Sequence, residues 1–157
     1  MNALLTPALP ENGLVAAYQA TDFIVRANGT ITLRVDVPVQ GLANWLKDQD
    51  ARSAVVITAY SPFSRPTSDD ENTRMQDELR NAVSDAGLSW GDASGAARDG
   101  AWPEEPGQCV FNAPEQLIDS WLERFEQYAV VSATLDGQCR LVWHPAIRAQ
   151  MAMRDAP

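Results

Sequence analysis

Hydrophobic and polar residues alternate most regularly near the N-terminus. Two β-rich runs, at residues 23–26 and 30–35, flank the dipeptide Asn28-Gly29. This dipeptide favours the positive φ angles of a two-residue type I′ turn. In the second run every other residue is apolar, which puts Arg34 on the face opposite the apolar set. The pattern therefore predicts a β-hairpin with one buried face.

Apolar residues recur at helical spacing in several further segments. Short helices are predicted after Pro10 and from Gly41. A longer amphipathic helix is predicted to begin with Pro114, because proline is favoured at the first helical position. Each of these helices is expected to bury one apolar stripe.

The helix with the clearest boundaries is predicted over residues 69–86. Ser68 and Glu71 form a capping box, in which each side chain satisfies the backbone amide of the other. Gly87 is the expected C-terminal stop. Continued towards the N-terminus, the apolar stripe of this helix reaches Asn72. We therefore expect Asn72 at the edge of the buried face, where its amide must find hydrogen-bond partners.

The remaining strands are predicted from apolar, β-branched runs. Residues 54–60 are almost continuously apolar, which is typical of a central strand covered on both faces. Residues 108–111 form a short predicted strand. Residues 128–135 and 138–143 flank Asp136-Gly137, which predicts a second hairpin.

Residues 87–107 show neither the helical nor the strand period, and they contain five glycines and two prolines. An unstructured connection of this length is uncommon in a compact domain and is usually a lid, a binding loop or a disordered segment. Trp90 and Trp102 lie within it and argue against plain disorder. We expect this segment to cover a site.

The order of elements is (α)ββαβαβαββ, which predicts an α+β fold. We expect a mixed or antiparallel sheet of about six strands, with two hairpins and three to four packed helices. Residues 1–10 are expected to be a flexible arm, residues 11–145 a single domain, and residues 146–157 a tail that frays.

The chain is acidic, with 12 Lys and Arg against 21 Asp and Glu and a formal net charge of −9. Such a surface repels phosphate backbones and anionic lipids, so we expect no nucleic-acid partner and no membrane partner. A signal peptide begins with a positively charged stretch, but the first ten residues contain no Lys or Arg. These features predict a cytoplasmic protein with reduced thiols at Cys109 and Cys139.

The residue types needed for several chemistries are scarce. The chain has one histidine and two cysteines, so zinc sites with four cysteine and histidine ligands are excluded. It has no phosphate-binding loop, dinucleotide-binding turn or nucleophile elbow. We predict no metal and no cofactor. No nucleophile and base set is recognisable either, so an enzyme is the least favoured class.

Polar side chains gather where the buried strand at residues 54–60 meets the helix at 69–86. Hydroxyls, a guanidinium and a helix N-terminus together suit an anion. The candidate binding residues at this join are Thr58, Ser61, Ser64, Arg65 and Asn72, with Arg34 as a second cation. The alternative is that these side chains only cap the helix and form turns.

Trp102 and Glu104 are candidates to complete this site from the long segment that precedes the strand at 108–111. Trp102 could stack on a planar ligand, and Glu104 could accept a hydrogen bond. Adjacent residues of an extended segment point apart, so at most one of Glu104 and Glu105 faces a given site. A solvated acidic loop is the alternative.

Taken together, these segments resemble a bacterial family of proteins of unknown function, DUF3293. The resemblance covers roughly residues 14–143. The matching parts are Tyr18, residues 33–35, residues 42–46, the block of Thr58, Ala59, Pro62 and Ser64 followed by Glu71-Asn72, residues 102–105 and residues 127–131. The family implies no activity, substrate or cofactor, but it implies that residues 58–72 and 102–105 lie together.

Two functions from different classes fit the sequence. The first is a binding domain that holds an anionic small molecule at residues 58–72. The second is an acidic interaction protein, such as an inhibitor, that masks a basic partner protein, and the net charge of −9 is its support. If the protein binds an anion, we expect Arg34, Arg65 and Asn72 to lie together beside residues 58–72. If it masks a basic partner, we expect its Asp and Glu residues to gather on one exposed face away from residues 58–72.

Overall fold

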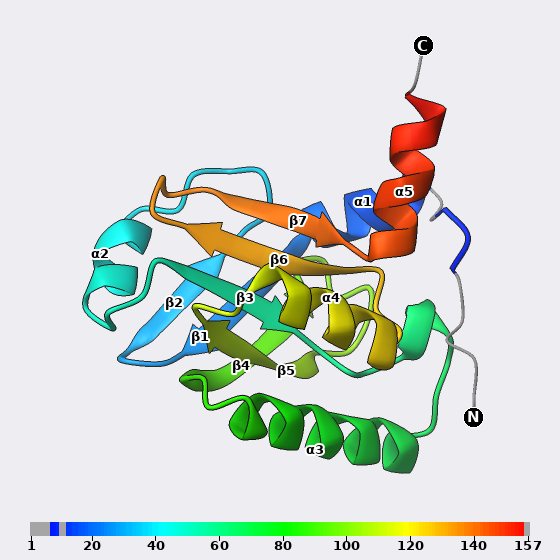
Figure 1. Ribbon diagram of the computed structural model, residues 1–157, viewed down its shortest axis with the longest axis horizontal. Coiled ribbons are helices and arrows are strands. Elements are labelled where there is room, and N and C mark those ends of the chain that lie inside the picture. Colours follow the sequence, from blue (N-terminus) through cyan, green and yellow to red (C-terminus); the bar gives the residue numbers. More distant parts are fainter. Residues whose placement is uncertain (1–6, 10–11, 156–157) are drawn as a thin grey trace.

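The computed structural model describes residues 7–9 and 12–155, so most of the arm expected at residues 1–10 lies outside the described residues. Within the described chain, helices and strands alternate in small groups (Figure 1). The elements are α1 (Asn12–Gln19), β1 (Thr21–Arg26), β2 (Thr30–Leu33), α2 (Leu42–Lys47), β3 (Ser53–Ile57), a 3₁₀ turn η1 (Pro62–Ser64), α3 (Asp69–Asp85), β4 (Trp90–Ala97), β5 (Glu105–Phe111), α4 (Glu115–Arg124), β6 (Ala129–Thr134), β7 (Cys139–Trp143) and α5 (Pro145–Arg154).

The strands form one antiparallel sheet in the order β2-β1-β4-β5-β3-β6-β7. This confirms the predicted α+β class. It also confirms the central place of β3, which lies between β5 and β6. Its residues from Ala54 to Ile57 are all buried, as a strand covered on both faces requires.

The sheet curls until its two edges meet. The backbone N–H of Asp36, just after β2, donates to the carbonyl of Cys139 in β7 at 2.9 Å. The N–H of Val39 donates to the carbonyl of Gly137 at 2.9 Å. The curled sheet therefore has an inner face and an outer face, like the wall of a small barrel.

The inner face buries apolar side chains from all seven strands of the sheet. Helix α2 fills one end of this interior with Leu42, Trp45 and Leu46, as the sequence predicted. The indole N–H of Trp45 donates to the carbonyl of Ala27 at 2.9 Å. This bond satisfies the polar atom of a largely buried indole.

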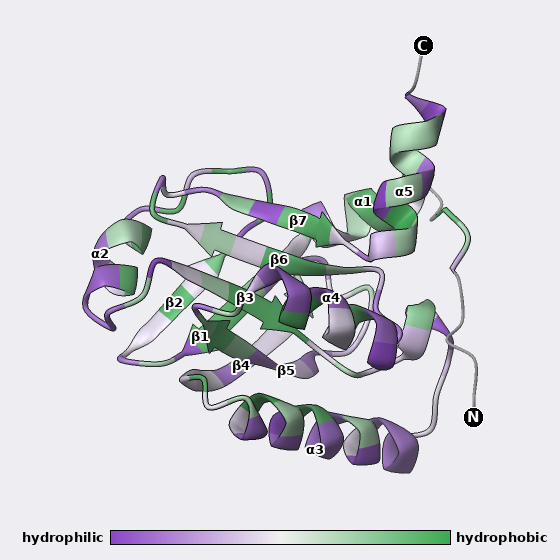
Figure 2. Cartoon of the chain, viewed as in Figure 1, coloured by the Kyte–Doolittle hydropathy of each residue, from purple (hydrophilic) through white to green (hydrophobic). Residues whose placement is uncertain are grey.

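The outer face is covered by α3 and α4. Figure 2 shows α3 with its hydrophobic side towards the sheet and its hydrophilic side away from it. Leu79 and Val83 from α3 and Trp121 from α4 pack in one cluster with Val55 and Ile57 of β3. The predicted helical stripes are therefore buried against the strand that was predicted to need cover on both faces.

The segment 87–107 is not one long loop, and this prediction was wrong. Strand β4 and the start of β5 occupy most of it, so the sheet has seven strands instead of about six. The hydrophobic pattern does not predict β4, because this strand consists mainly of small residues. A Cβ at Gly91 would lie 2.7 Å from the Cβ of Ala27, so the close approach of β4 to the β1–β2 turn excludes a larger residue there.

The C-terminal segment also differs from its prediction. Residues expected to fray form α5, whose Ile147 is completely buried. His144 precedes the helix, and its Nδ1 accepts a hydrogen bond from the N–H of Ala146 at 3.0 Å. A histidine nitrogen thus takes the capping role that Ser or Asp usually fills.

Two local predictions hold at the level of single hydrogen bonds and dihedral angles. The Ser68 hydroxyl accepts from the N–H of Glu71 at 3.2 Å, which confirms the helix cap. The Glu71 carboxylate pairs with Arg74 instead of reaching back to the Ser68 amide, so half of the capping box forms. The first hairpin has positive φ at Asn28 and Gly29 as predicted, but its loop has three residues because Arg26 pairs with Thr30.

Candidate functional site

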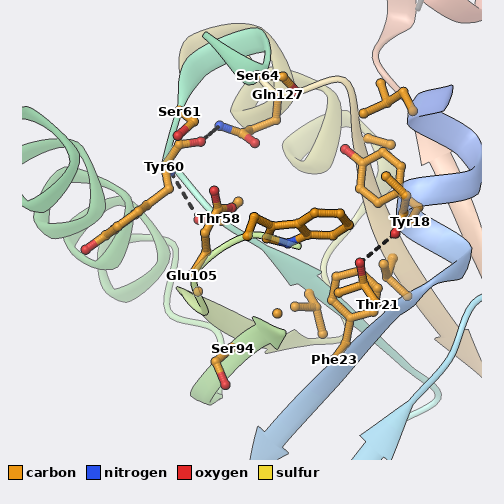
Figure 3. Close-up of a pocket in the computed structure, with 18 residues that line it drawn as sticks. Tyr18, Thr21, Phe23, Thr58, Tyr60, Ser61, Ser64, Ser94, Glu105 and Gln127 are labelled. Atoms are coloured by element: carbon orange, nitrogen blue, oxygen red, sulfur yellow. Dashed lines mark hydrogen bonds between the residues drawn. The ribbon is translucent and has the colours of Figure 1, made fainter. Parts of the chain in front are cut away.

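A cavity of about 400 Å³ opens at the mouth of the curled sheet (Figure 3). This mouth lies beside α1, whereas α2 lies at the other end of the sheet (Figure 1). Its wall is the inner face of β1, β3, β4, β5 and β6. Helix α1 covers one side through Leu14, Ala17 and Tyr18. The wall is mainly apolar, with a few polar groups from the loops at the strand ends.

Two glycines leave room for the cavity. A Cβ at Gly107 would lie 2.7 Å from the carbonyl oxygen of Ile57, so packing against β3 forces a glycine there. A Cβ at Gly95 would lie 3.5 Å from the Phe23 ring, which is ordinary van der Waals contact. A Cβ at Gly95 therefore fits without displacing a neighbour, and a larger side chain at this position would extend from the inner face of β4 into the cavity.

The rim after β3 contains a strained backbone. Ser61, Phe63 and Ser64 have positive φ angles of 48°, 46° and 59°, which residues other than glycine rarely adopt. The N–H of Ser61 donates to Asn72 Oδ1 at 2.9 Å, and the N–H of Phe63 donates to the carbonyl of Glu126 at 2.6 Å. Strain of this kind persists where neighbouring groups hold the chain, and it gathers at functional sites.

Gln127 holds the opposite side of the rim. It is 6 % exposed, and its Nε2 donates to the carbonyls of Tyr60 and Phe125, both at 3.1 Å. Both hydrogens of the amide are therefore used within the protein, and Oε1 has no protein donor among the described residues. Figure 3 shows the Gln127 amide at the cavity, whereas the Tyr60 ring points away from it.

Tyr18 and Glu105 are the ionisable side chains turned towards the cavity. Burial raises the pKa of Glu105. Burial, and then the negative charge of nearby Glu105, raise the pKa of Tyr18 far above its ordinary value. The Glu105 side chain makes no hydrogen bond or ion pair with any other described residue. It can therefore accept a hydrogen bond or a proton from a ligand.

Four of the residues proposed from the sequence line this cavity, namely Thr58, Ser61, Ser64 and Trp102. The hydroxyl of Thr58 donates to the carbonyl of Pro106 at 2.8 Å. This bond ties the loop after β3 to the start of β5. The cavity thus brings together the two segments that the family resemblance places side by side.

The two candidate arginines lie off the cavity, each paired with a carboxylate. Arg34 Nε lies 2.9 Å from Asp22 Oδ1, and Arg65 Nη2 lies 2.8 Å from Glu126 Oε2. Each arginine side chain is at least half exposed to solvent. Their charges therefore serve surface ion pairs, which contribute little to stability.

The other two candidates also lie outside the cavity. Asn72 is 5 % exposed and braces the rim from behind, because its Oδ1 holds the N–H of Ser61. Glu104 faces Arg26 at 3.8 Å and borders a second hollow that Arg80 also lines. Of the two adjacent glutamates, Glu105 is the one that lines the cavity.

Tyr18, Glu105 and Gln127 are among the cavity residues that were not chosen from the sequence. They come from α1, the start of β5 and the turn before β6, so no local spacing connects them. All three stand within the segments that carry the family resemblance. The family resemblance could therefore have identified these three residues as candidates, although it assigns them no role.

The part of the chain that the structure describes offers neither a metal centre nor a membrane span. Among its residues, no group of three or more His, Cys, Asp and Glu side chains could hold a metal ion. No helix in the described ranges is long and apolar enough to cross a membrane.

Comparison with known proteins connects this site to a family. No curated protein and no solved structure matches the chain. The family model described as "Protein of unknown function (DUF3293)" matches residues 57–130. The matched segment begins at the end of β3 and includes Thr58, Glu105 and Gln127, whereas Tyr18 lies before it. This match supports the assignment of the chain to the DUF3293 family.

Proposed function

We propose that the protein is a small-molecule-binding domain whose ligand occupies the cavity at the mouth of the curled sheet. The observation that carries this proposal is the preformed hollow of about 400 Å³, with an apolar wall and a few convergent polar groups. Small-molecule sites in proteins are typically of this size and composition, and the mouths of β-barrels are one of their recurrent places.

The charge of the ligand follows from the lining. The expectation of an anionic ligand depended on Arg34 and Arg65, which form ion pairs elsewhere. No lysine or arginine lines the cavity, whereas Glu105 does. An anion placed there would meet a carboxylate and no cation, so a neutral or cationic molecule fits better. An anionic ligand stays a prediction that the experiment below also covers.

The alternative, an acidic protein that masks a basic partner, is supported by the net charge of −9. Along α3, the acidic residues are interleaved with Arg74 and Arg80, which pair with their neighbours. This interleaving disperses the negative charge, whereas a basic partner would need a concentrated acidic face. We therefore rank this function second, and we expect no nucleic-acid partner for the same acidic chain.

We place the binding function in the cytoplasm. Cys109 and Cys139 are buried free thiols, which fits a reducing compartment. The proposal would be contradicted if fractionation of the cells that make the protein recovered it outside the cytoplasm.

The experiment blocks the cavity without disturbing the fold. Gly95→Val adds an isopropyl group beside Phe23, where a Cβ has ordinary contact distance. Ala96→Val is the matched control, because the next residue of β4 points to the other face of the sheet. Both variants and the wild type are screened by thermal shift and titration calorimetry against nucleotides, sugar phosphates, carboxylates, alcohols and amines.

A ligand at 100 times its dissociation constant should stabilise the wild type by about 2.7 kcal/mol. We expect Ala96→Val to keep this stabilisation and Gly95→Val to lose it. Binding that survives in Gly95→Val would place the ligand outside the cavity and overturn the proposal. So would a screen in which no compound class stabilises the wild type.

A further inference from the structure

Two hydrogen-bond acceptors reach the cavity without a protein donor. One is the carboxylate of Glu105, which makes no hydrogen bond or ion pair with any other described residue. The other is Oε1 of Gln127, whose Nε2 already makes two hydrogen bonds at 3.1 Å. Both atoms are accessible at the cavity, and a half-buried carboxylate loses free energy if a ligand covers it without a hydrogen-bond donor. A ligand that donates hydrogen bonds would satisfy both.

The threonine hydroxyls of the cavity do not supply the missing donors. Thr21 Oγ1 donates to the carbonyl of Ala17 at 2.6 Å, and Thr58 Oγ1 donates to the carbonyl of Pro106 at 2.8 Å. A hydroxyl has one hydrogen, so neither threonine can donate to a ligand, and Thr58 Oγ1 also accepts from the N–H of Tyr60 at 3.1 Å. The two threonines therefore leave the Glu105 carboxylate available to a ligand donor.

The rest of the wall suits a cation with an apolar body. Tyr18, Phe23 and Trp102 line the cavity and offer aromatic surface, to which cations are attracted. Val56 and Val131 supply aliphatic surface on the inner face of the sheet. Figure 3 shows Tyr18 and Glu105 on opposite sides of the cavity. A molecule lying between them would have aromatic contact at one end and a carboxylate at the other.

We infer that the ligand is an organic amine, bound as its ammonium, whose positive nitrogen is received by Glu105 while its apolar body lies against Tyr18, Phe23 and Trp102. This inference rests on the proposed function and adds the chemical class of the ligand. The Gln127 oxygen provides a further acceptor for a nitrogen or hydroxyl hydrogen of the same molecule. Both adjacent glutamates are acidic, but they serve different surfaces, because Glu104 faces Arg26 outside the cavity.

The test compares ligands that differ in one functional group and variants that differ by one position. The probes are 2-phenylethylamine and tryptamine, their alcohol counterparts 2-phenylethanol and tryptophol, and 3-phenylpropionate. Binding to the full chain is measured by NMR titration and by calorimetry. Glu105→Gln removes the charge while it keeps the shape, and Glu104→Gln is the matched control at the neighbouring exposed position.

We expect each amine to bind wild type at least tenfold more tightly than its alcohol. Glu105→Gln should remove this preference, and Glu104→Gln should keep it. The unfolding midpoint of each variant without ligand shows that it is folded, and Glu105→Asp, which keeps the charge, should retain part of the preference. These results together would support the inference.

Three outcomes would overturn the inference. The first is that the alcohols or the carboxylate bind as tightly as the amines or more tightly, while Gly95→Val still blocks their binding. The proposed binding function would then hold, and the assignment of an amine ligand would be wrong. The second is the same loss in Glu104→Gln as in Glu105→Gln, which would assign the effect to general surface charge. The third is no binding of any probe to the wild type, and if the wider screen is also blank, the proposed function fails with it.

Discussion

Asn72 Oδ1 accepts the backbone N–H of Ser61 at 2.9 Å, and this bond joins the first turn of α3 to the strained rim of the cavity. The asparagine is 5 % exposed, so the bond is shielded from water. A side chain that first suggested ligand binding thus has a structural partner. Its position shows how α3, which lies on the outer face of the sheet, still shapes the cavity.

Asn72→Ala should destabilise the fold, because it leaves the N–H of Ser61 without its acceptor. The expected loss in the free energy of unfolding is about 1–3 kcal/mol, the usual cost of an unsatisfied buried donor. Urea denaturation measures it. Asn81→Ala, at an exposed position of the same helix, should change stability by less than about 0.5 kcal/mol. Equal effects at the two positions would contradict a bracing role for Asn72.

The two cavity glycines should respond differently to alanine. Gly107→Ala places a Cβ 2.7 Å from the carbonyl oxygen of Ile57, so β3 and β5 must move apart. Gly95→Ala has its closest contact at 3.5 Å and needs no movement. We expect a loss of about 1–3 kcal/mol for the first variant, as for other overpacked sites, and a change near zero for the second. Similar denaturation midpoints would show that the strands are not packed as described.

The single histidine should make stability depend on pH. Burial, the largest cause, lowers the pKa of His144 below its ordinary value of 6.5, and Arg148 lowers it further, whereas Glu123 and Asp119 raise it. The unfolded chain then binds more protons than the folded chain at mildly acidic pH. The contribution of His144 is therefore fully present above pH 6.5 and is lost as pH falls from there through the lower pKa of the folded state.

Urea midpoints between pH 7.5 and 5 check this dependence. His144→Asn is the reference variant, because its side-chain oxygen can cap α5 but does not titrate in this range. We expect the wild type to lose stability relative to the variant as pH falls. A difference that is constant over the whole range would show that the Nδ1 bond to Ala146 is not the titrating contact.

The two thiols should be unreactive in the native protein. Burial raises the pKa of Cys109 to about 12. Burial also raises the pKa of Cys139, to about 11. The thiolate is the reactive form, so a disulfide reagent at pH 8 should label neither side chain before unfolding and both in urea. Fast labelling of the native chain at either position would mean that the inner face of the sheet opens readily.

Part of the fold could be predicted because its signals are local. The Ser68 cap, the positive φ angles at Asn28 and Gly29, and the two-sided burial of β3 each depend on residues close together in the chain. Such signals reflect backbone preferences and hydrophobic periodicity, which act without reference to the rest of the molecule. They were sufficient for the fold class and for most of the elements.

Strand β4 shows where local signals fail. Its residues are mainly small and carry no alternation. Pairing with β1 and β5 on its two sides supplies the backbone hydrogen bonds that make it a strand. Tertiary context thus overrides a weak intrinsic preference, and the close approach at Gly91 even requires a residue that disfavours strands.

The sequence by itself determined the α+β class, the Ser68 helix cap, the apolar faces of the helices, and the loop after β3 as a place where polar groups gather. Only the tertiary structure decided which of those groups share one cavity. The curl of the sheet places Tyr18, Glu105 and Gln127 around the mouth and leaves Arg34 and Arg65 in surface ion pairs. The physical reason is that adjacent side chains of a strand point to opposite faces. The pairing of distant strands therefore decides that Glu105 faces the cavity and Glu104 does not.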